Sequence, residues 1–272
     1  MQTFCQGVLC TQISPNDRAF LYGDGVFTSV RVRLGQPRLW PQHQARLLLA
    51  RQRLGLQFDL AEVRRYTALY AQQLQHGTLK IIISRGESAR GYLPPNQPAQ
   101  IYYQLISSPM VAESQLNGLF VADQIESGIL QQHQIGYPMT ALVGLKTLNR
   151  LEQVLLRQAL ASTSWPEALV CDLDGRIIEG VQSNCWLLID GQWVTPRLDR
   201  AGVAGVMRTE IMQRMQHRRI VFDQLDIPST QADQIQALFF CNAITGILAV
   251  KRLDGRALQT KPVDSLLADL LS

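Results

Sequence analysis

The segment "GVFTSVRVRLGQPRLW", residues 25–40, limits the possible folds more than any other stretch of the chain. Side chains of two kinds alternate along it, which is typical of a strand with two different faces. The stretch "LGQPR" then supplies a hairpin turn. One face of the predicted strand carries Val26, Thr28, Val30 and Val32, and the other carries Phe27, Ser29, Arg31 and Arg33.

Helical segments follow this strand. "HQARLLLARQRLGL" places Leu47, Ala50 and Leu54 on one apolar stripe, and a second helix is expected at about 60–75. Further strands and helices alternate to the end of the chain, without regular crossover helices between strands. The pattern predicts mixed α/β (or α+β) sheets and disfavours a doubly wound parallel sheet.

The length of 272 residues fits two domains. The first is expected at 1–107, and a linker at 108–117, where periodicity is lost between Pro109 and Gly118. The second domain is expected at 118–272 and carries Lys146.

Composition excludes several classes of protein. A net charge of +4 with scattered arginines does not resemble a nucleic-acid footprint, so an acidic small molecule is the expected partner. The N-terminal stretch and the lack of a long apolar run predict a cytoplasmic protein outside the membrane. Five widely spread cysteines without zinc spacing predict reduced thiols and no metal site.

Lysine is rare here, with four lysines against twenty-two arginines. Lys146 lies between "TALVGL" and an apolar stripe formed by Leu148, Leu151, Val154 and Leu155. These neighbours predict a partly buried position, where a lysine becomes a neutral amine that condenses with carbonyl groups. A solvated lysine is the alternative for any lysine taken by itself.

A Schiff-base lysine serving pyridoxal phosphate needs a partner for the pyridine nitrogen and a clamp for the phosphate. Glu179 in "GRIIEGVQSN" could be that partner, or an ordinary turn glutamate. For the phosphate, Arg46 lies on a predicted helix, and the glycines of "AGVAGVMRTE" precede another helix whose N-terminus could bind an anion. "CNAITG" is a second turn that could complete the site, or a plain turn.

These segments resemble a known family when read in order. "LYGDGVF", "HQARL", "SRGESARGY", "GLKTLNRLEQVL", "EGVQSN" and "AGVAGVMR" are similar, over nearly the whole chain, to motifs of the fold type IV (class IV) pyridoxal phosphate enzymes. This group includes branched-chain and D-amino acid aminotransferases. "KTLNRLEQVL", "TPRLDRAGVAGVMR" and "CNA" most resemble its aminodeoxychorismate lyases. The resemblance implies a two-domain fold with pyridoxal 5'-phosphate as cofactor.

The resemblance also implies roles for single residues. Lys146 would be the Schiff-base lysine, Glu179 the pyridine-nitrogen partner and Arg46 the phosphate arginine. The backbone N–H groups of Val206 and Met207 and the segment around Asn242 would bind the phosphate. The transaminases tend to have threonines in the two phosphate turns, where this chain has Met207 and Ala243.

On the substrate side, Arg90 is the preferred carboxylate ligand, with Tyr92 beside it. Arg85 is equally well explained as a strand-end ion pair. Thr28 and Ser29 replace the glutamate and glycine of branched-chain transaminases, and a small hydroxyl could leave room for a cyclohexadiene and pass a proton. For Thr28, β-propensity is the competing explanation.

By resemblance, the reaction is conversion of 4-amino-4-deoxychorismate to 4-aminobenzoate and pyruvate in folate biosynthesis, by a homodimer. An aminotransferase acting on D- or branched-chain amino acids uses the same residues and is the alternative, because fold does not fix the reaction. A non-catalytic binding protein is a third reading.

Overall fold

The computed structural model describes residues 1–109 and 121–271. The chain divides into two compact units, one with Met1–Ala112 and Leu145–Arg150, the other with Glu113–Gly144 and Leu151–Ser272. Most of the linker predicted at 108–117 lies outside the described residues. Both units combine helices with sheets, so the mixed α/β prediction is confirmed.

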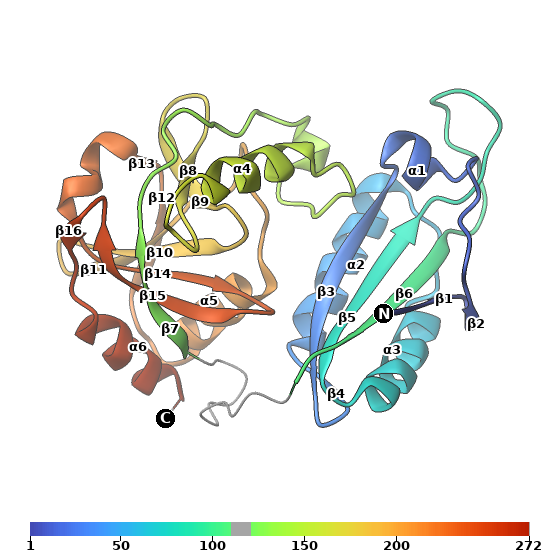
Figure 1. Ribbon diagram of the computed structural model, residues 1–272, viewed down its shortest axis with the longest axis horizontal. Helices are drawn as coiled ribbons and strands as arrows, with labels where there is room; N and C mark the ends of the chain where they lie inside the picture. The colour runs from blue at the N-terminus through green and yellow to red at the C-terminus, as the bar shows by residue number, and fades with distance from the viewer. Residues whose placement is uncertain (110–120, 272) are drawn as a thin grey trace. The chain divides into compact units, whose positions relative to one another are not determined.

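A six-stranded antiparallel sheet forms the centre of the first unit, with the strand order β2-β1-β6-β5-β3-β4 (Figure 1). The strands are β1 (Gln2–Cys5), β2 (Val8–Leu9), β3 (Gly25–Arg33), β4 (Gln36–Pro37), β5 (Gly77–Ser84) and β6 (Gln100–Ser107). The helices are α1 (Arg18–Tyr22), α2 (Trp40–Leu54) and α3 (Leu60–Leu74).

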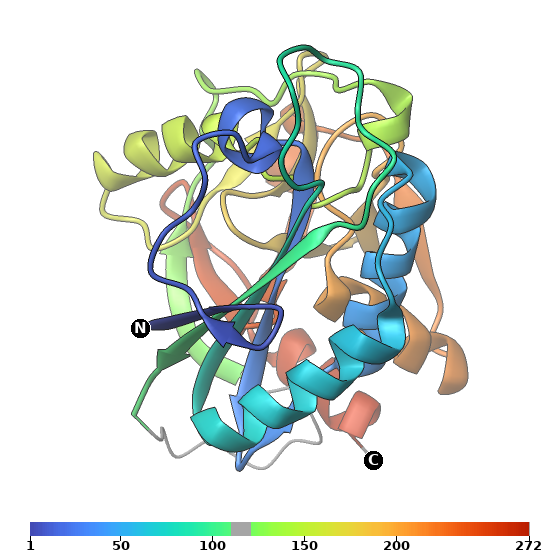
Figure 2. The ribbon, with the colours of Figure 1, turned by 90° about the vertical axis from the view of Figure 1, so that its right-hand side faces the viewer.

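Helices α2 and α3 cover one face of this sheet (Figure 2). Their apolar residues, including Leu47 and Val63, form one core with every second residue of β3 and β5, from Val26 to Ile83. The alternation in β3 is confirmed, because Val26, Val30 and Val32 are buried in this core. The opposite face of β3 is only partly buried.

The capping residues explain why the helices begin and end where they do. The Asp59 carboxylate accepts a hydrogen bond from Ala61 N at 2.8 Å and starts α3. Gly55 ends α2 in the left-handed conformation, with φ of 62°.

The second unit contains a seven-stranded sheet in the order β12-β11-β10-β14-β15-β16, with β7 parallel to β15, and a three-stranded sheet β13-β9-β8. Its strands are β7 (Val121–Ser127), β8 (Leu169–Cys171), β9 (Arg176–Gly180), β10 (Asn184–Ile189), β11 (Gln192–Pro196), β12 (Phe222–Leu225), β13 (Ile227–Pro228), β14 (Ile235–Asn242), β15 (Gly246–Leu253) and β16 (Arg256–Ala257). Its helices are η1 (Thr140–Leu142), α4 (Leu151–Ala161), α5 (Val206–His217), η2 (Ser229–Gln234) and α6 (Lys261–Leu271).

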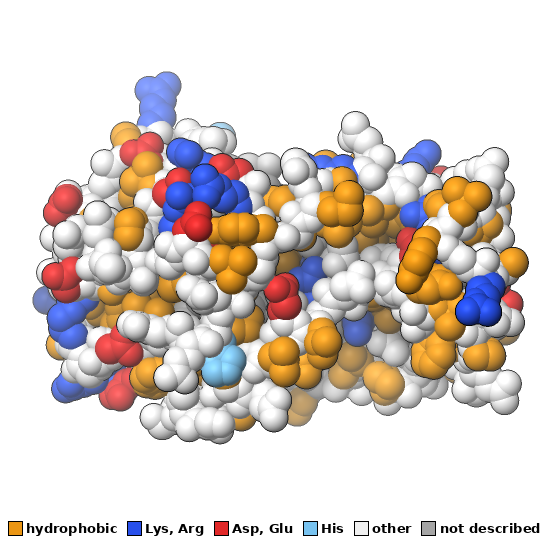
Figure 3. Space-filling model, turned by 90° about the horizontal axis from the view of Figure 1, so that it is seen from above, with side chains coloured by type: hydrophobic (Ala, Val, Ile, Leu, Met, Phe, Trp, Pro, Cys, Tyr) orange, Lys and Arg blue, Asp and Glu red, His pale blue; other side chains and the backbone are white. Residues whose placement is uncertain are grey.

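Side-chain exposure corrects one expectation about the helix after Lys146. Leu151, Val154 and Leu155 are exposed, whereas α4 buries Leu156 and Leu160. These exposed side chains therefore do not bury Lys146, whose Nζ lies beside the ring of Phe27 in strand β3. Apolar side chains are also visible in several separate groups on the face drawn in Figure 3.

Two further observations concern the whole described chain. No described helix is both long and apolar enough to cross a membrane. All five cysteines are free, and Cys171, Cys185 and Cys241 are buried.

Candidate cofactor and substrate site

Lys146 lies beside the beginning of strand β3. Phe27 N donates a hydrogen bond to Lys146 O at 3.0 Å, and Leu148 N donates to Gly25 O at 3.0 Å. A Cβ on Gly25 would overlap the Ile83 carbonyl oxygen, so glycine is required where β3 approaches β5 this closely. The structure therefore places Lys146 in the first unit, not in the second domain predicted from the sequence.

The side chain of Lys146 is partly buried, and its Nζ lies 4.8 Å from the centroid of the Phe27 ring. Arg150 stiffens the turn around it, since its guanidinium donates to Leu145 O at 3.2 Å and Thr147 O at 2.9 Å. These carbonyls flank Lys146 on both sides. The amine is consequently held on a fixed backbone beside an aromatic face.

Arg46 belongs to a polar cluster on the helix-covered face of β3. Its Nη1 donates to Thr28 Oγ1 at 3.3 Å, and His43 Nδ1 lies 2.6 Å from the same hydroxyl. Thr28 and His43 are fully buried. Thr28 thus contacts Arg46, whereas Ser29 lies on the other face of β3 with Phe27.

Burial is the main cause that lowers the pKa of Arg46, to about 10, and the positive charge of Arg150 lowers it further. Arg46 still carries its charge at neutral pH. Two neighbouring guanidinium groups repel each other, and a bound dianion would relieve that repulsion. A phosphate group has the appropriate charge.

Glu179 lies at the end region of β9 and is buried, with 5% of its surface exposed. Its Oε2 accepts a hydrogen bond from Val203 N at 2.9 Å. Gly202 directly precedes Val203 and has a φ of +83°. A Cβ at Gly202 would overlap the side chains of Ile178 and Leu198. Glu179 is a positioned carboxylate inside the second unit.

Helix α5 begins at Val206 and Met207, both buried, after Gly205. Gly205 caps the helix without a side-chain hydrogen bond, so donors of the first turn remain for an anion. A Cβ on Gly205 would overlap Asn184 Oδ1, while Asn184 Nδ2 donates to Val203 O at 2.9 Å. Asn184 therefore fixes the approach to α5.

Asn242 shapes the second turn with its own side chain. Its Oδ1 accepts from Ile244 N at 2.9 Å and Thr245 N at 2.7 Å, and its Nδ2 donates to Ser183 Oγ at 3.0 Å. Ser183 Oγ in turn donates to Glu167 Oε2 at 2.8 Å. Burial raises the pKa of Glu167, against the lowering effect of its hydrogen bonds.

Arg85 is engaged by groups of the first unit. Its Nε pairs with Asp24 Oδ2 at 2.8 Å, and its terminal nitrogens donate to Gly55 O and Leu54 O. Asp24 also pairs with Arg18 at 2.8 Å. This geometry favours the ion-pair interpretation of Arg85 and leaves its guanidinium little capacity for a substrate.

Arg90 and Tyr92 lie in the loop between β5 and β6. Arg90 is exposed, and the Tyr92 side chain is 85% exposed, with its ring 5.4 Å from Tyr22. Arg18 holds this loop by donating to Gly91 O and Tyr92 O at 2.9 Å. The structure does not bring Arg90 or Tyr92 to Lys146 within the first unit.

The sequence reasoning missed several supporting residues. His43 belongs to the motif "HQARL", and Ser183 and Asn184 belong to "EGVQSN". His43 precedes Arg46 by one helical turn, and residues at this spacing share a helix face.

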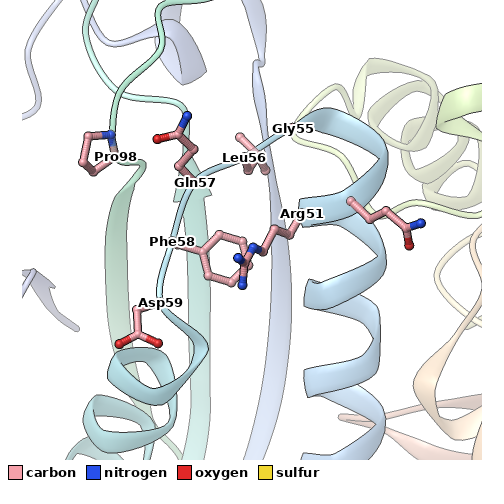
Figure 4. Close-up of a pocket in the computed structure, with 8 residues that line it drawn as sticks. Arg51, Gly55, Leu56, Gln57, Phe58, Asp59 and Pro98 are labelled. Atoms are coloured by element: carbon pink, nitrogen blue, oxygen red, sulfur yellow. The ribbon is translucent and has the colours of Figure 1, made fainter.

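A separate hollow on the first unit does not involve these residues. It is lined by the connection between α2 and α3, including Leu56 and Phe58, and by Pro98 (Figure 4). The Arg51 guanidinium lies 5.8 Å from the Phe58 ring centroid. None of the predicted site residues lines it.

Comparison with known proteins identifies the family. The family model for class IV amino-transferases matches residues 25–253. The chain belongs to this family. Its members depend on pyridoxal phosphate, so this protein is a pyridoxal phosphate-dependent enzyme and the cofactor prediction is confirmed.

Individual relatives include both lyases and aminotransferases. An aminodeoxychorismate lyase of Vibrio harveyi is 27% identical over 250 residues, which cover 90% of this chain and 88% of that protein. A D-alanine aminotransferase of Bacillus licheniformis is 22% identical, covering 89% of this chain and 83% of that protein. The crystal structure of 4-amino-4-deoxychorismate lyase from Pseudomonas aeruginosa matches with a TM-score of 0.88 and 32% identity, covering 99% of this chain and 97% of that one.

The chemistry of the side chains fits the cofactor. The first unit carries an amine that would suit its aldehyde, Lys146, and a cation that would suit its phosphate, Arg46. The second unit carries a carboxylate that would suit its ring nitrogen, Glu179. The first turn of α5 supplies backbone donors of the type that binds phosphate. In the Asn242 turn, the N–H groups of Ile244 and Thr245 donate to Asn242 Oδ1.

Proposed function

We propose that the protein is a lyase that converts 4-amino-4-deoxychorismate to 4-aminobenzoate and pyruvate, a reaction of folate biosynthesis. The observation that supports this most is the likeness to the Pseudomonas aeruginosa lyase, 32% identical over 99% of this chain. The aminotransferase relatives at 20–24% identity match less closely.

In this proposal each predicted residue has a task. Bound pyridoxal phosphate supplies an electron sink. Glu179 would stabilise the positive charge at its ring nitrogen, and Arg46, the backbone N–H groups of Val206 and Met207, and the segment around Asn242 would hold its phosphate. Lys146, once its amine is free, takes the proton from the ring carbon that bears the substrate nitrogen.

Loss of that proton allows the enolpyruvyl ether bond to break. The electron pair of the broken bond leaves with the enolpyruvate oxygen, and protonation of the enolpyruvate methylene carbon then gives pyruvate as the oxygen forms its carbonyl bond. The remaining ring becomes aromatic, which favours elimination. Positioning alone can therefore direct a shared cofactor to lyase chemistry.

The two hydroxyl residues are proposed to act differently. Thr28 holds Arg46 through their hydrogen bond, and Ser29 offers a small hydroxyl on the face of β3 that also carries Phe27. We retain Arg90 as the proposed ligand of a substrate carboxylate, with Tyr92 beside it, because both lie in an exposed loop that substrate can reach. Arg85 is not needed in this role.

Two further expectations belong to the proposal. The enzyme is expected to be a homodimer, as the family resemblance implies, and to act in the cytoplasm. Light scattering during size-exclusion chromatography measures the mass in solution, and a monomer at working concentration contradicts the homodimer.

The first experiment tests Lys146 and the reaction together. The purified wild type is expected to show a visible absorbance band that borohydride removes, and Lys146→Ala is expected to lack it. With aminodeoxychorismate the wild type should release pyruvate and 4-aminobenzoate in equal amounts.

Each contrary result has a distinct meaning. A colourless wild type that takes up no added pyridoxal phosphate removes Lys146 from the proposed role. Keto acid formation from D- or branched-chain amino acids, without release of 4-aminobenzoate, establishes an aminotransferase instead.

A further inference from the structure

A second lysine, Lys80, lies in the middle of the first unit's sheet. It belongs to β5, which has β3 on one side and β6 on the other. Across the two antiparallel pairs, Lys80 stands opposite Ser29 and Gln104. A lysine in the middle of a central strand is uncommon, because such positions usually pack against apolar neighbours.

The direction of the Lys80 side chain follows from alternation along β5. Leu79 and Ile81 are fully buried in the core beneath α2 and α3, so Lys80 points to the opposite face. Ser29 shares that face, because directly opposed residues of an antiparallel pair point the same way. Lys80 is only partly buried there.

The ammonium groups of Lys80 and Lys146 both lie near the ring of Phe27. Lys80 Nζ lies 5.0 Å and Lys146 Nζ 4.8 Å from the centroid of the Phe27 ring. These are two of only four lysines in the chain. The ring attracts an ammonium group on either side chain.

No carboxylate among residues 1–109 and 121–271 forms an ion pair with Lys80. The positive charge continues along this face, since Arg31 follows Ser29 at the next position of the alternation. Burial lowers the pKa of Arg31, and the charges of Arg33 and Arg38 lower it further. The face beside Lys146 is therefore positively charged and suited to an anionic group.

We propose that Lys80 is a specificity-determining residue that binds a carboxylate of the substrate while Lys146 serves the reacting carbon. This inference rests on the proposed function and refines it. The favoured substrates are amines that carry a carboxylate on the part of the molecule away from the reacting nitrogen. Such a group distinguishes an aminocyclohexadiene dicarboxylate from simple amino acids.

The test compares holoenzymes with Lys80→Met, Lys80→Arg and, as a matched loss of an exposed lysine in the second unit, Lys251→Met. Lys80→Met is expected to raise KM for aminodeoxychorismate about 10- to 100-fold, as for loss of a charge-assisted hydrogen bond, with a much smaller change in kcat. Lys80→Arg should restore most of the affinity. Lys251→Met should behave as wild type.

A binding measurement separates this inference from the lyase proposal. Titration calorimetry at low salt measures how tightly wild type and the same variants bind 4-aminobenzoate. Aniline is the matched probe that lacks the carboxylate. Wild type should prefer 4-aminobenzoate, and Lys80→Met should lose that preference, whichever reaction the enzyme performs. Added salt should weaken the preference in wild type.

Three results would overturn the role of Lys80. The first is equal 4-aminobenzoate affinity in wild type and Lys80→Met. The second is a wild type that binds 4-aminobenzoate no better than aniline. The third is a borohydride-reduced cofactor found by peptide mapping on Lys80, which would make it the Schiff-base lysine. A wild type that binds 4-aminobenzoate through Lys80 but releases no pyruvate contradicts only the lyase proposal.

Discussion

At the scale of single residues, a buried histidine supports the proposed phosphate arginine. His43 is completely buried, and its Nε2 has no hydrogen-bond partner among the described residues. Burial lowers its pKa well below the ordinary value of 6.5, and the charge of Arg46 acts in the same direction. His43 is therefore neutral when it contacts the Thr28 hydroxyl.

This environment predicts a pH dependence of stability. Below pH 6.5 the unfolded chain binds a proton at His43 that the folded chain does not bind. The contribution of His43 is therefore present above pH 6.5 and is lost as pH falls, by up to about 1.4 kcal/mol per pH unit. Urea unfolding of wild type and His43→Asn between pH 7.5 and 5.5 measures it.

Asparagine can still bond to Thr28 but does not titrate, so the pH slope of His43→Asn should be shallower than that of wild type. His133→Asn, which removes an exposed histidine, is the control and should keep the wild-type slope. Identical slopes in wild type and His43→Asn would show that His43 titrates normally in the fold.

Single residues also show where sequence reasoning stops. Lys146 and Glu179 could be proposed from rarity, flanking residues and motif order. The sequence left Arg85 undecided between substrate and ion pair, because its partner Asp24 is 61 residues away along the chain. Long-range partners become visible only when the sheet has formed.

At the scale of elements, Gly205 precedes α5 because a larger residue would overlap its neighbours, not because the backbone adopts a conformation that requires glycine. Gly205 has φ of −67° and ψ of 139°, which alanine also adopts. The added Cβ would, however, displace Asn184. The effect of a substitution therefore reports on the shape of the proposed phosphate turn.

Gly205→Ala is expected to weaken pyridoxal phosphate binding by about tenfold or more while the chain stays folded, because displacing Asn184 breaks its hydrogen bond to Val203 O in the segment that leads into α5. Equilibrium titration of the apoenzyme by absorbance gives the affinity, and circular dichroism reports folding. In the control Gly136→Ala, the Cβ meets only the end of the Glu152 side chain, at 3.2 Å, and affinity should be unchanged. Wild-type affinity in Gly205→Ala would mean that the turn does not bind the phosphate.

The element after Lys146 shows a different limit of prediction. Its periodicity predicts a helix with an apolar stripe, yet the side chains of Leu151, Val154 and Leu155 in that stripe are exposed. Periodicity establishes which residues share a face, but it does not say whether that face meets a core. The register of β3 was easier to predict, because alternation over eight residues permits one assignment of faces.

At the scale of the whole molecule, each unit has its own core. Residues 145–150 belong to the first unit although they follow part of the second unit in the sequence.

A ligand that binds only the folded enzyme stabilises it by mass action. At one hundred times its dissociation constant the gain is about 2.7 kcal/mol. Pyridoxal phosphate is expected to provide such a gain.

The melting temperature of the apoenzyme should therefore rise by several degrees with pyridoxal phosphate, and by much less with pyridoxal, which lacks the phosphate. Arg46→Gln should lose most of the difference between the two ligands, whereas the exposed Arg157→Gln should retain it. Calorimetry of wild type and the two variants, each with either ligand, checks this. An undiminished difference in Arg46→Gln would exclude Arg46 from phosphate binding.

Hydrophobic periodicity along the chain predicts the mixed α/β class and the faces of β3, and the order of the motifs predicts the family and the candidate cofactor residues. Three features follow only from the folded chain: Lys146 belongs to the first unit, Arg85 pairs with Asp24, and Lys80 and Lys146 both lie near the Phe27 ring. These contacts join residues far apart in sequence. Their partners are chosen by the burial of apolar strands and helices, which no short stretch of sequence records.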